Sequence, residues 1–249
     1  MRIVTWNVNG IRAREAQLAE WLANDRPDIL CLQEIKAAPE QVPATLKDLP
    51  GYWNCWHGQR GYSGVSMHIS RGLLAAEPSF SHPVFDFENR IVTARIGNLL
   101  VASTYVPNGG KDFDAKIRFL NSMREFARET RMAGRELALC GDLNVARTDQ
   151  DVHLKERDPQ AIGQLPEERD LLESLLAEGL VDVCRAFDPD NDALFTWWPP
   201  WRQMRQRNIG WRIDYILASD SLAGRLNRSE VLASVGTSDH APVAIEVAG

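Results

Sequence analysis

The stretch IVTARIGNLLVASTY, residues 91–105, decides the fold class, because it contains two strand patterns joined by a two-residue turn. Residues 91–96 and 99–105 are rich in apolar and β-branched side chains, which favour strands. Gly97-Asn98 between them is typical of a tight β-hairpin. The stretch therefore predicts two neighbouring antiparallel strands.

Helices and further strands alternate on both sides of this hairpin. Helical spacing of apolar residues predicts helices over residues 14–24 and 112–131, and from Pro166 to a C-terminal cap at Gly179. Strands are predicted at residues 3–8, 29–32, 52–56, 65–70, 137–140, 213–217 and 243–247. Hairpins mixed with strand–helix–strand units predict an α/β protein with two packed sheets and helices outside.

Composition limits the class of protein. The 249 residues are 44% hydrophobic and 25% charged, which is ordinary for a globular chain, and suit one large domain or two small ones. The chain has no apolar run of 18 residues, so we expect no membrane-spanning segment. None of the four cysteines forms a CxxC pair, which predicts free thiols and a cytoplasmic location.

Arginine and tryptophan are interleaved between Ala193 and Ile213, where the chain has no acidic residue although its net charge is −6. The stretch holds Arg202, Arg205, Arg207, Arg212, Trp197, Trp198, Trp201 and Trp211. Cations for phosphate and flat rings for stacking are what an unpaired nucleotide needs. A tryptophan-rich core loop with a solvated basic rim explains the same composition equally well.

Polar residues follow several of the predicted strands. Glu34 comes after the second strand, where a carboxylate is a suitable Mg²⁺ ligand; its alternative is a surface pair with Lys36. Asp142 and Asn144 follow the strand at residues 137–140. In an extended chain these two side chains point the same way and converge on one site. The alternative is an Asx turn.

Ser238-Asp239-His240 contains the only histidine with an acid immediately before it. A histidine acting on phosphate needs a second group to fix its tautomer, and Asp214 fits that role. Asp239 then faces a metal or water. The alternatives are a turn before the last strand and an ion pair of Asp214 with Arg212. His57, His68, His82 and His153 receive no role.

Several segments together match one family in order and spacing. They are residues 7–13 (Asn-Val-Asn-Gly-Ile-Arg-Ala), Gln33-Glu34, Tyr62-Ser63-Gly64-Val65, Tyr105-Val106-Pro107-Asn108, Gly141-Asp142-Leu143-Asn144, residues 208–215 and Ser238-Asp239-His240. The chain resembles, over nearly its whole length, the exonuclease III and apurinic/apyrimidinic endonuclease branch of the endonuclease/exonuclease/phosphatase superfamily.

The resemblance implies a single domain over residues 1–249 with a four-layer α/β sandwich, in which two facing mixed β-sheets are flanked by helices. It implies Mg²⁺-dependent hydrolysis 5′ to abasic sites, with Mn²⁺ as a possible substitute, and 3′–5′ exonuclease and 3′-phosphatase or 3′-phosphodiesterase activity. The implied partner is double-stranded DNA with abasic sites or blocked 3′ ends. A monomer in a bacterial-type cytoplasm, working on the nucleoid, is expected.

The resemblance also assigns roles to residues. Asp142 would orient or deprotonate the attacking water with the help of Asn144, and Glu34 would bind Mg²⁺ with Asp239 and Asn7. His240, oriented by Asp214, and Tyr105 would contact the phosphate or the leaving oxygen. The implied substrate-binding residues are Trp197, Trp211 and Ile213 for the abasic sugar, Arg12, Arg60, Tyr62 and Asn108 for the phosphates, and Lys111 at the position of an inserted arginine.

Two departures from the family pattern leave alternatives open. In residues 153–163, Asp158 and Ala161 stand where DNA-contacting residues are expected, and Trp201 lies in a stiff Trp-Pro-Pro-Trp run as a wedge or a packed ring. One alternative is therefore a 3′-end-cleaning specialist with weak abasic endonuclease activity. A non-catalytic nucleic-acid-binding regulator is disfavoured, because the chain keeps the acids and the histidine of the site.

Overall fold

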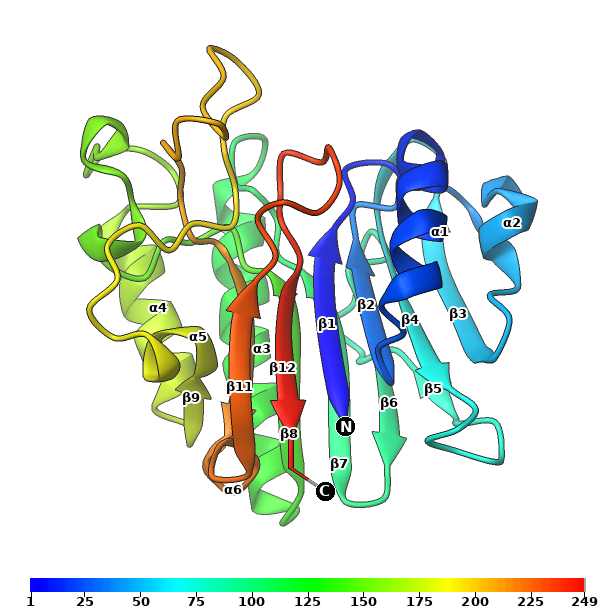
Figure 1. Cartoon of the computed structure of the whole chain (residues 1–249). Coiled ribbons are helices and arrows are strands. Elements are labelled where there is room, and N and C mark those ends of the chain that lie inside the picture. Colours follow the sequence, from blue (N-terminus) through cyan, green and yellow to red (C-terminus); the bar gives the residue numbers. More distant parts are fainter. Residues whose placement is uncertain (249) are drawn as a thin grey trace.

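Two β-sheets pack face to face and helices cover the outer faces, which gives the molecule four layers (Figure 1). The structure is a computed structural model and describes residues 1–248. The predicted sandwich of two facing mixed sheets flanked by helices is confirmed. Within the described residues, no helix combines the length and the apolar character needed to cross a bilayer.

The first sheet contains both ends of the chain. Its strands are β1 (Arg2–Asn7), β2 (Ile29–Gln33), β3 (Tyr52–Gln59), β4 (Tyr62–Ser70), β11 (Leu226–Val231) and β12 (Val243–Val247). They lie in the order β11-β12-β1-β2-β4-β3. β1 runs parallel to β2 and antiparallel to β12, so the ends of β1 and β2 meet at the same edge as the start of β12.

The second sheet is built around the predicted hairpin. Its strands are β5 (Phe80–Ser81), β6 (Ile91–Ile96), β7 (Leu99–Tyr105), β8 (Glu136–Asp142), β9 (Leu180–Asp182) and β10 (Asp214–Ser219). They lie in the order β5-β6-β7-β8-β10-β9. The hairpin of β6 and β7 has the predicted bounds, and Gly97 in its turn has φ 59°. A left-handed residue at this position suits a tight hairpin turn.

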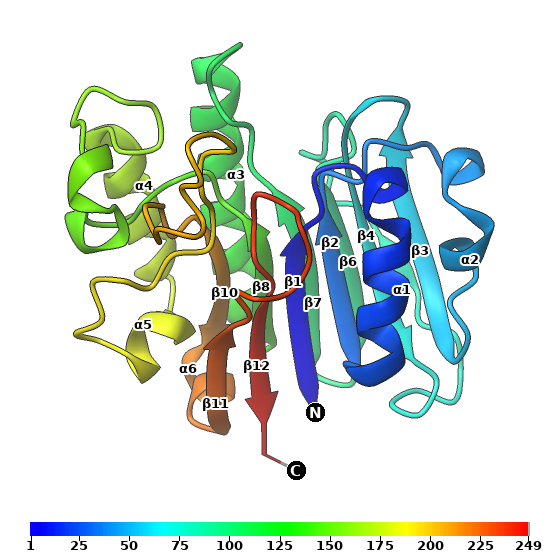
Figure 2. The same ribbon diagram turned by 45° about the horizontal axis from the view of Figure 1, so that its top comes forward.

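Helices bury apolar faces on the outside of each sheet. They are α1 (Glu15–Asn24), α2 (Ala44–Lys47), α3 (Phe113–Met132), α4 (Pro166–Leu176), α5 (Val183–Phe187) and α6 (Asp220–Ala223). Short 3-10 turns lie at Ile11–Arg14, Pro39–Gln41, Asp149–Asp151 and Leu154–Glu156. α1 and α2 cover the first sheet, whereas α3 and α4 cover the second (Figures 1 and 2). A third apolar core fills the space between the sheets.

Strand and helix ends differ from the predictions by a few residues, and three strands were missed. α3 begins after Asp112, whose side chain caps the helix by accepting from the backbone nitrogen of Ala115 at 2.8 Å. α4 ends at Leu176, before the predicted cap at Gly179. β5 and β9 are too short for a periodicity, and β11 is a partly exposed edge strand with polar residues.

The buried His68 predicts a fall in stability at acid pH. Burial lowers the pKa of His68 from 6.5 to about 3, so the folded protein excludes a proton that the unfolded chain binds. The free energy of unfolding should therefore fall by up to ~1.4 kcal/mol for each pH unit below about 6.5 on account of this residue. We expect His68→Gln to remove that part of the slope in urea titrations between pH 7 and pH 4.5. Parallel pH curves for the two proteins would contradict this.

Candidate active site

The polar strand-end residues gather around a cavity of about 310 Å³ at one end of the sandwich. This end lies at the top of Figure 1 and comes forward in Figure 2. The cavity is lined by Glu34, Tyr105, Asn108, Asp142, Asn144, Ile162, Trp197, Trp211, Ile213, Asp239 and His240. All of these except Ile162 are residues that the sequence pointed to. The structure thus brings together side chains from all parts of the chain.

His240 and Asp214 form a buried pair. His240 Nδ1 lies 2.9 Å from Asp214 Oδ2, and because an ionised carboxylate only accepts, Nδ1 carries a hydrogen. Burial opposes the charge on His240, but the charge and hydrogen bond of Asp214, together with the charges of Asp142 and Asp239, outweigh burial and raise the pKa of His240 to about 10. His240 Nε2 lies 3.9 Å from Asp142 Oδ2. The pair therefore places a positive imidazolium beside the cavity.

Asp142 ends β8 and is buried opposite Asp214 in the ladder between β8 and β10. Burial, reinforced by the negative charge of Asp214, raises the pKa of Asp142 to about 7. The two oxygens of Asp142 accept from Asn7 Nδ2 and from the backbone nitrogen of Asn144, both at 2.9 Å. A fixed carboxylate with a pKa near neutrality is suited to take a proton from water.

Asn144 reaches Asp142 by a different route from the predicted one. The chain does not stay extended, because Asn144 has φ 52° and its backbone nitrogen bonds the Asp142 side chain in an Asx turn. The extended prediction is therefore wrong. The turn nevertheless brings Asn144 Nδ2 to within 3.3 Å of Asp142 Oδ2, and Asn144 Nδ2 also donates to the Val106 carbonyl at 2.9 Å.

Glu34 follows β2 in a left-handed conformation with φ 50°. Its Oε2 lies 2.7 Å from Lys36 Nζ, and its Oε1 accepts from Asn7 Nδ2 at 3.1 Å. Burial acts to raise the pKa of Glu34, but the charge and hydrogen bond of Lys36, with the charge of His240 and the hydrogen bond from Asn7, together hold the pKa below its usual value. The alternative pair with Lys36 therefore exists, and it keeps an ionised Glu34 at the cavity wall.

Tyr105 and Asp239 occupy other parts of the wall. Burial, with the negative charges of Glu34 and Asp142, raises the pKa of Tyr105 well above its usual value, so its hydroxyl stays protonated and can donate. Burial also acts to raise the pKa of Asp239, but the positive His240 and the hydrogen bonds from Asn9 and Trp197 together outweigh it, and the pKa is lowered. Asp239 is therefore ionised at neutral pH.

Two asparagines of the first loop orient these acids. Asn7 presents its amide nitrogen to Glu34 and Asp142, while its oxygen accepts from the backbone nitrogen of Asn9 at 3.0 Å. The donor end of the Asn7 amide thus faces the two carboxylates, and the metal-ligand role of Asn7 stays a prediction. Asn9, which had no assigned role, donates to Asp239 Oδ1 at 2.8 Å.

The carboxylates of Glu34 and Asp142 could hold a divalent cation, because their ligand oxygens lie within 4.8 Å of each other and of a ring nitrogen of His240. His240, as an imidazolium, has no lone pair to offer the ion. Oxygen ligands from two carboxylates suit a hard cation such as Mg²⁺, which keeps several of its waters. Asp239 lines the same cavity outside this group, with its Oδ2 accepting from Trp197 Nε1 at 3.1 Å. Asp239 can therefore reach such an ion through a water.

One wall of the cavity is aromatic and aliphatic. Trp197 and Trp211 pack edge to face with ring centroids 5.6 Å apart, and Ile213 lies beside them in the same apolar cluster. The predicted three-residue pocket is thus assembled. Ile162 adds an exposed aliphatic side chain to it from the segment of residues 153–163. A lone aliphatic residue in a loop of mixed polarity gave no sequence signal.

The predicted phosphate-binding residues lie in segments that follow or join strands at the cavity end of the sandwich, and Asn108 lines the cavity itself. Arg12, Arg60 and Asn108 are exposed, and Lys111 Nζ lies 5.8 Å from the ring centroid of Tyr62, which is 41% exposed. Asn108 Nδ2 also donates to Asn144 Oδ1 at 3.3 Å. These side chains are therefore free to meet a polyanion that covers the cavity.

Two buried cations support the site from behind, and sequence reasoning missed both. Arg90 donates to the Tyr62 hydroxyl at 2.9 Å and to the Tyr105 carbonyl at 3.3 Å. Lys116 forms a buried ion pair with Glu168 and donates to the carbonyls of Asn108 and Asn144, at 3.2 and 2.7 Å. Neither residue stands in a recognisable motif.

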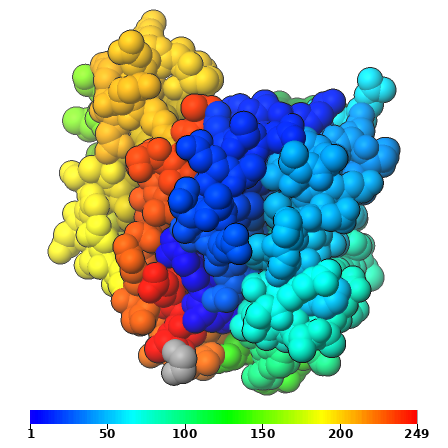
Figure 3. All heavy atoms as spheres, turned by 45° about the vertical axis from the view of Figure 1, so that its right-hand side comes forward, coloured from blue at the N-terminus to red at the C-terminus, as the bar shows by residue number. Residues whose placement is uncertain are grey.

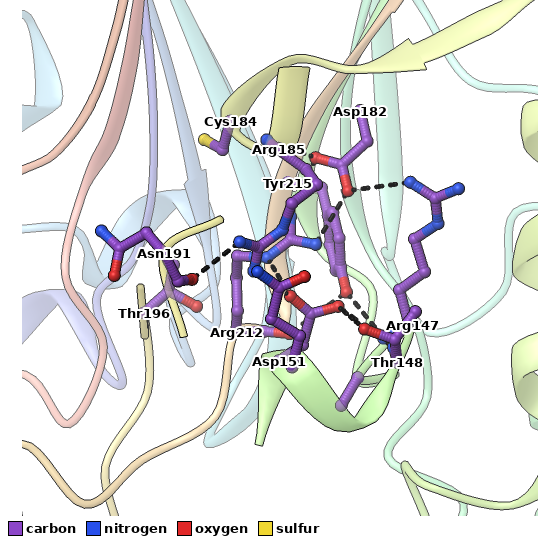
Figure 4. Close-up of polar contacts among 12 residues, drawn as sticks. Arg147, Thr148, Asp151, Asp182, Cys184, Arg185, Asn191, Thr196, Arg212 and Tyr215 are labelled. Carbon is purple, nitrogen blue, oxygen red and sulfur yellow. Dashed lines mark hydrogen bonds and ion pairs between the residues drawn. The ribbon is translucent and has the colours of Figure 1, made fainter. Parts of the chain in front are cut away.

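Arg212 belongs to a buried ion network instead of a DNA-facing surface (Figure 4). Its Nε lies 2.7 Å from Asp151 Oδ1, and its two terminal nitrogens lie 2.8 Å from the two oxygens of Asp182. The alternative pairing of Arg212 with Asp214 is therefore wrong. Arg185 joins the network through Asp151 at 2.6 Å.

The tryptophans of the same stretch divide into two groups. Trp198 is 2% exposed and packs with Phe195, Met204 and Ile209, as a core loop would. Trp201 is 56% exposed, so it is not a packed ring. The loop around it projects from the molecule beside the site and is coloured yellow to orange in Figure 3. The stretch therefore contains a buried core loop, as one interpretation predicted, and an exposed aromatic side chain, as the other predicted.

An Asp–His pair, a buried acid with a raised pKa and an oxygen-rich cation site at the strand ends of a four-layer sandwich define the class of phosphoester hydrolases. Residues 4–240 match the Endonuclease/Exonuclease/phosphatase family, and the chain belongs to that family.

Curated relatives place the chain more closely. It is 33% identical to an exodeoxyribonuclease of Bacillus subtilis over 98% of both chains. It is 32% identical to the DNA repair nuclease APEX1 of Danio rerio, covering all of this chain and 82% of that protein. Recombination repair protein 1 of Drosophila melanogaster is also 32% identical, but the chain spans 37% of its length. The resemblance to the exonuclease III and apurinic/apyrimidinic endonuclease branch is confirmed.

Solved structures agree with this placement. A 3′–5′ exonuclease from Neisseria meningitidis superposes with a TM-score of 0.89 at 33% identity over the full length of both chains. A Neisseria 3′ phosphatase bound to a product DNA hairpin gives a TM-score of 0.87 at 32% identity, again over both full chains. An AP endonuclease from Archaeoglobus fulgidus gives 0.88 at 29% identity over 99% of each chain.

Proposed function

We propose that the protein is a Mg²⁺-dependent DNA-repair nuclease that hydrolyses the phosphodiester 5′ to abasic sites in double-stranded DNA. We further propose that it removes nucleotides and blocking phosphates from 3′ ends at the same site. The observation that carries the proposal is the single cavity in which Asp142, His240 and Glu34 face the aromatic pair Trp197 and Trp211. Chemistry on phosphate and selection of the sugar thus share one space.

Asp142 is the residue that would orient and deprotonate the attacking water. Its pKa of about 7 allows it to be ionised yet still basic near neutral pH. Asn144 and Asn7 hold its two oxygens, so the carboxylate does not rotate away. The imidazolium of His240, fixed by Asp214, would stabilise the negative charge on a non-bridging phosphate oxygen.

Glu34 would hold the magnesium ion, and Asp239 would act through its waters; Mn²⁺ is a possible substitute. When bound, the ion would supply positive charge against the charge that grows on the leaving oxygen. Tyr105 stays protonated and would donate a hydrogen bond to the phosphate or the leaving oxygen. These three side chains line the wall around Asp142.

Abasic selectivity would come from the size and polarity of the pocket formed by Trp197, Trp211 and Ile213. An abasic sugar has no base to unstack, so turning it out of the duplex costs less than turning out a normal nucleotide. A small apolar pocket excludes nucleotides that keep their base. Arg12, Arg60 and the other predicted phosphate-binding residues would bind the flanking phosphates.

A gel assay on two labelled duplexes tests the proposal. One duplex carries an internal abasic analogue and the other a nick with a 3′-phosphate, each incubated with Mg²⁺ or with EDTA. We expect Mg²⁺-dependent incision 5′ to the analogue together with removal of the 3′-phosphate. If both duplexes are bound and neither reacts, the proposal fails and the non-catalytic regulator takes its place.

Metal removal should abolish turnover without unfolding the protein. The acids of the site are held by Asn7, Asn9 and Lys36, so the site has partners without the ion. We expect EDTA to lower incision by at least about 100-fold, and added Mg²⁺ to restore it. Glu34→Gln should raise the Mg²⁺ concentration needed for half-maximal activity. Full activity in EDTA would contradict the metal requirement.

Trp211→Ala should weaken discrimination between abasic and intact duplex by about 10- to 100-fold, because it opens the apolar wall of the pocket. Trp211→Phe, which retains a flat ring, is the matched control and should keep most of the selectivity. Competition binding and incision rates on the two duplexes measure the ratio. Unchanged discrimination in the alanine variant would remove the pocket from substrate selection.

A second candidate is a specialist in cleaning 3′ ends with weak abasic endonuclease activity. Its support is the likeness to the Neisseria 3′ phosphatase and the presence of Asp158 and Ala161 in the segment of residues 153–163. In the gel assay such an enzyme would remove the 3′-phosphate and leave the abasic duplex intact. We also propose that the protein acts as a monomer in the cytoplasm, in line with its free cysteines.

A further inference from the structure

A second group of metal-binding side chains lies outside the catalytic cavity. It consists of His57, His82 and Asp86, whose ligand atoms all lie within 4.8 Å of one another. His57 belongs to β3, the edge strand of the first sheet, and His82 directly follows β5, the edge strand of the second. Figure 3 brings this side of the molecule, coloured cyan, to the front. The group therefore joins the edges of the two sheets.

The two imidazole rings and the carboxylate are in close contact. His57 Nε2 lies 2.6 Å from Asp86 Oδ2. The rings of His57 and His82 are stacked, with centroids 3.7 Å apart and an angle of 21° between their planes. The three side chains thus form one contiguous group of possible metal ligands.

Outer hydrogen bonds orient these side chains as metal ligands are commonly oriented. His82 Nδ1 lies 3.1 Å from the Ile91 carbonyl, which can only accept, so Nδ1 carries a hydrogen, and in the neutral tautomer with this hydrogen the lone pair lies on Nε2. Asp86 Oδ1 accepts from the backbone nitrogens of Arg90 and Ile91, at 2.8 and 3.1 Å. Its second oxygen is left to face His57. Such backbone partners fix the tautomer and the direction of ligands in metal sites.

We propose that His57, His82 and Asp86 form a structural zinc site that clips the two sheet edges together. Two imidazole nitrogens and one carboxylate, with a water as fourth ligand, are a donor set that Zn²⁺ accepts and Mg²⁺ avoids. Tetrahedral ligands of zinc lie about 3.4 Å apart, so His57 and Asp86 need to separate by less than about 1 Å from their hydrogen-bonded distance of 2.6 Å. The stacked imidazoles also need to turn, so that their in-plane lone pairs converge on one ion. The ion replaces the proton that they share.

The clip would act on the catalytic end through the backbone. Asp86 accepts a hydrogen bond from the backbone nitrogen of Arg90, and the Arg90 side chain donates to the Tyr62 hydroxyl and the Tyr105 carbonyl. Zinc at Asp86 therefore fastens the segment that supports this wall of the cavity. It touches no group assigned to the chemistry, so its effect is on stability.

Zinc titration of chelator-treated protein tests the site, with Mg²⁺ in excess to occupy the catalytic cavity. The wild type should bind one more equivalent of zinc than His82→Gln, a variant that changes an exposed side chain and should retain nuclease activity. His153→Gln, which removes a histidine outside the group, is the matched control and should bind zinc like the wild type. Glu34→Gln should still bind the additional equivalent of zinc, because this substitution changes the catalytic cavity and not the group of His57, His82 and Asp86.

Thermal unfolding gives a second readout that does not depend on nuclease activity. At a hundredfold excess over Kd, zinc should raise the Tm of the wild type by about 5–10 °C, and that of His82→Gln by much less. With Co²⁺ in place of zinc, the wild type should show the visible absorption of a nitrogen-ligated tetrahedral site. His82→Gln should not show it. Equal zinc content and equal Tm shifts in wild type and His82→Gln would overturn the proposal, leaving His57 and Asp86 as a plain ion pair.

Discussion

Asp142→Asn is expected to lower the turnover number by at least about 100-fold, because the substitution keeps the shape of the side chain and removes the base. The carboxylate is buried beside Asp214, and this raises its pKa to about 7. An amide at the same place cannot take a proton from water. Single-turnover incision of the abasic duplex measures the chemical step directly.

The fold should survive this substitution. A buried carboxylate whose pKa is raised destabilises the folded state when it is ionised, so Asp142→Asn should leave the Tm unchanged or higher. Asp48→Asn removes one exposed acid after α2 and serves as the control for charge alone. Near-wild-type turnover in Asp142→Asn would exclude this residue as the group that activates water.

Arg212→Met is expected to lower the free energy of unfolding by roughly 3–5 kcal/mol, because it removes the fully buried cation that two buried carboxylates share. Arg212 is fully buried and makes three hydrogen bonds of 2.7 to 2.8 Å to Asp151 and Asp182 (Figure 4). Methionine has a similar volume but no charge. Urea unfolding followed by tryptophan fluorescence would measure the loss.

A surface arginine provides the matched control. Arg228 is 57% exposed and pairs with Glu230 at 2.8 Å, so Arg228→Met should cost no more than about 1 kcal/mol. If Arg212→Met lowers the free energy of unfolding by less than about 1 kcal/mol, the buried carboxylates Asp151 and Asp182 do not depend on the charge of Arg212, and the prediction is wrong. Because Arg212 stands between Trp211 and Ile213, its removal should also disturb the sugar pocket.

Much of the fold was predictable because its signals are local. The bounds of β6, β7 and β12 follow from runs of apolar residues and from a two-residue turn. β9 and β11 were not predictable from the sequence, because one has three residues and the other alternates too weakly at a sheet edge. β9 forms only by pairing with β10, and β11 only by pairing with β12. Both partners come later in the sequence, so no local pattern indicates the pairing.

Most residues that line the cavity could also be predicted from the sequence, but their geometry could not. Asn7 and Asp142 are hydrogen-bonded across 135 residues, and nothing local tells which end of the Asn7 amide faces the acids. The positioning residues Arg90 and Lys116 were missed because their sequence contexts are those of ordinary surface cations. No acid or other metal-binding residue stands next to His57 or His82 in the sequence, yet their rings stack in the structure.

The sequence by itself determined the order of helices and strands, the acids and the histidine at strand ends, and the family to which the chain belongs. These depend on neighbours along the chain and on motif spacing. The sequence also indicated Asp214 as the partner of His240. Only the tertiary structure decided which other polar groups meet: Arg212 with Asp151 and Asp182, and His57 with Asp86. The physical reason is that the pKa and the energy of an ionised group depend on burial and on charges within a few ångströms, and folding alone creates both.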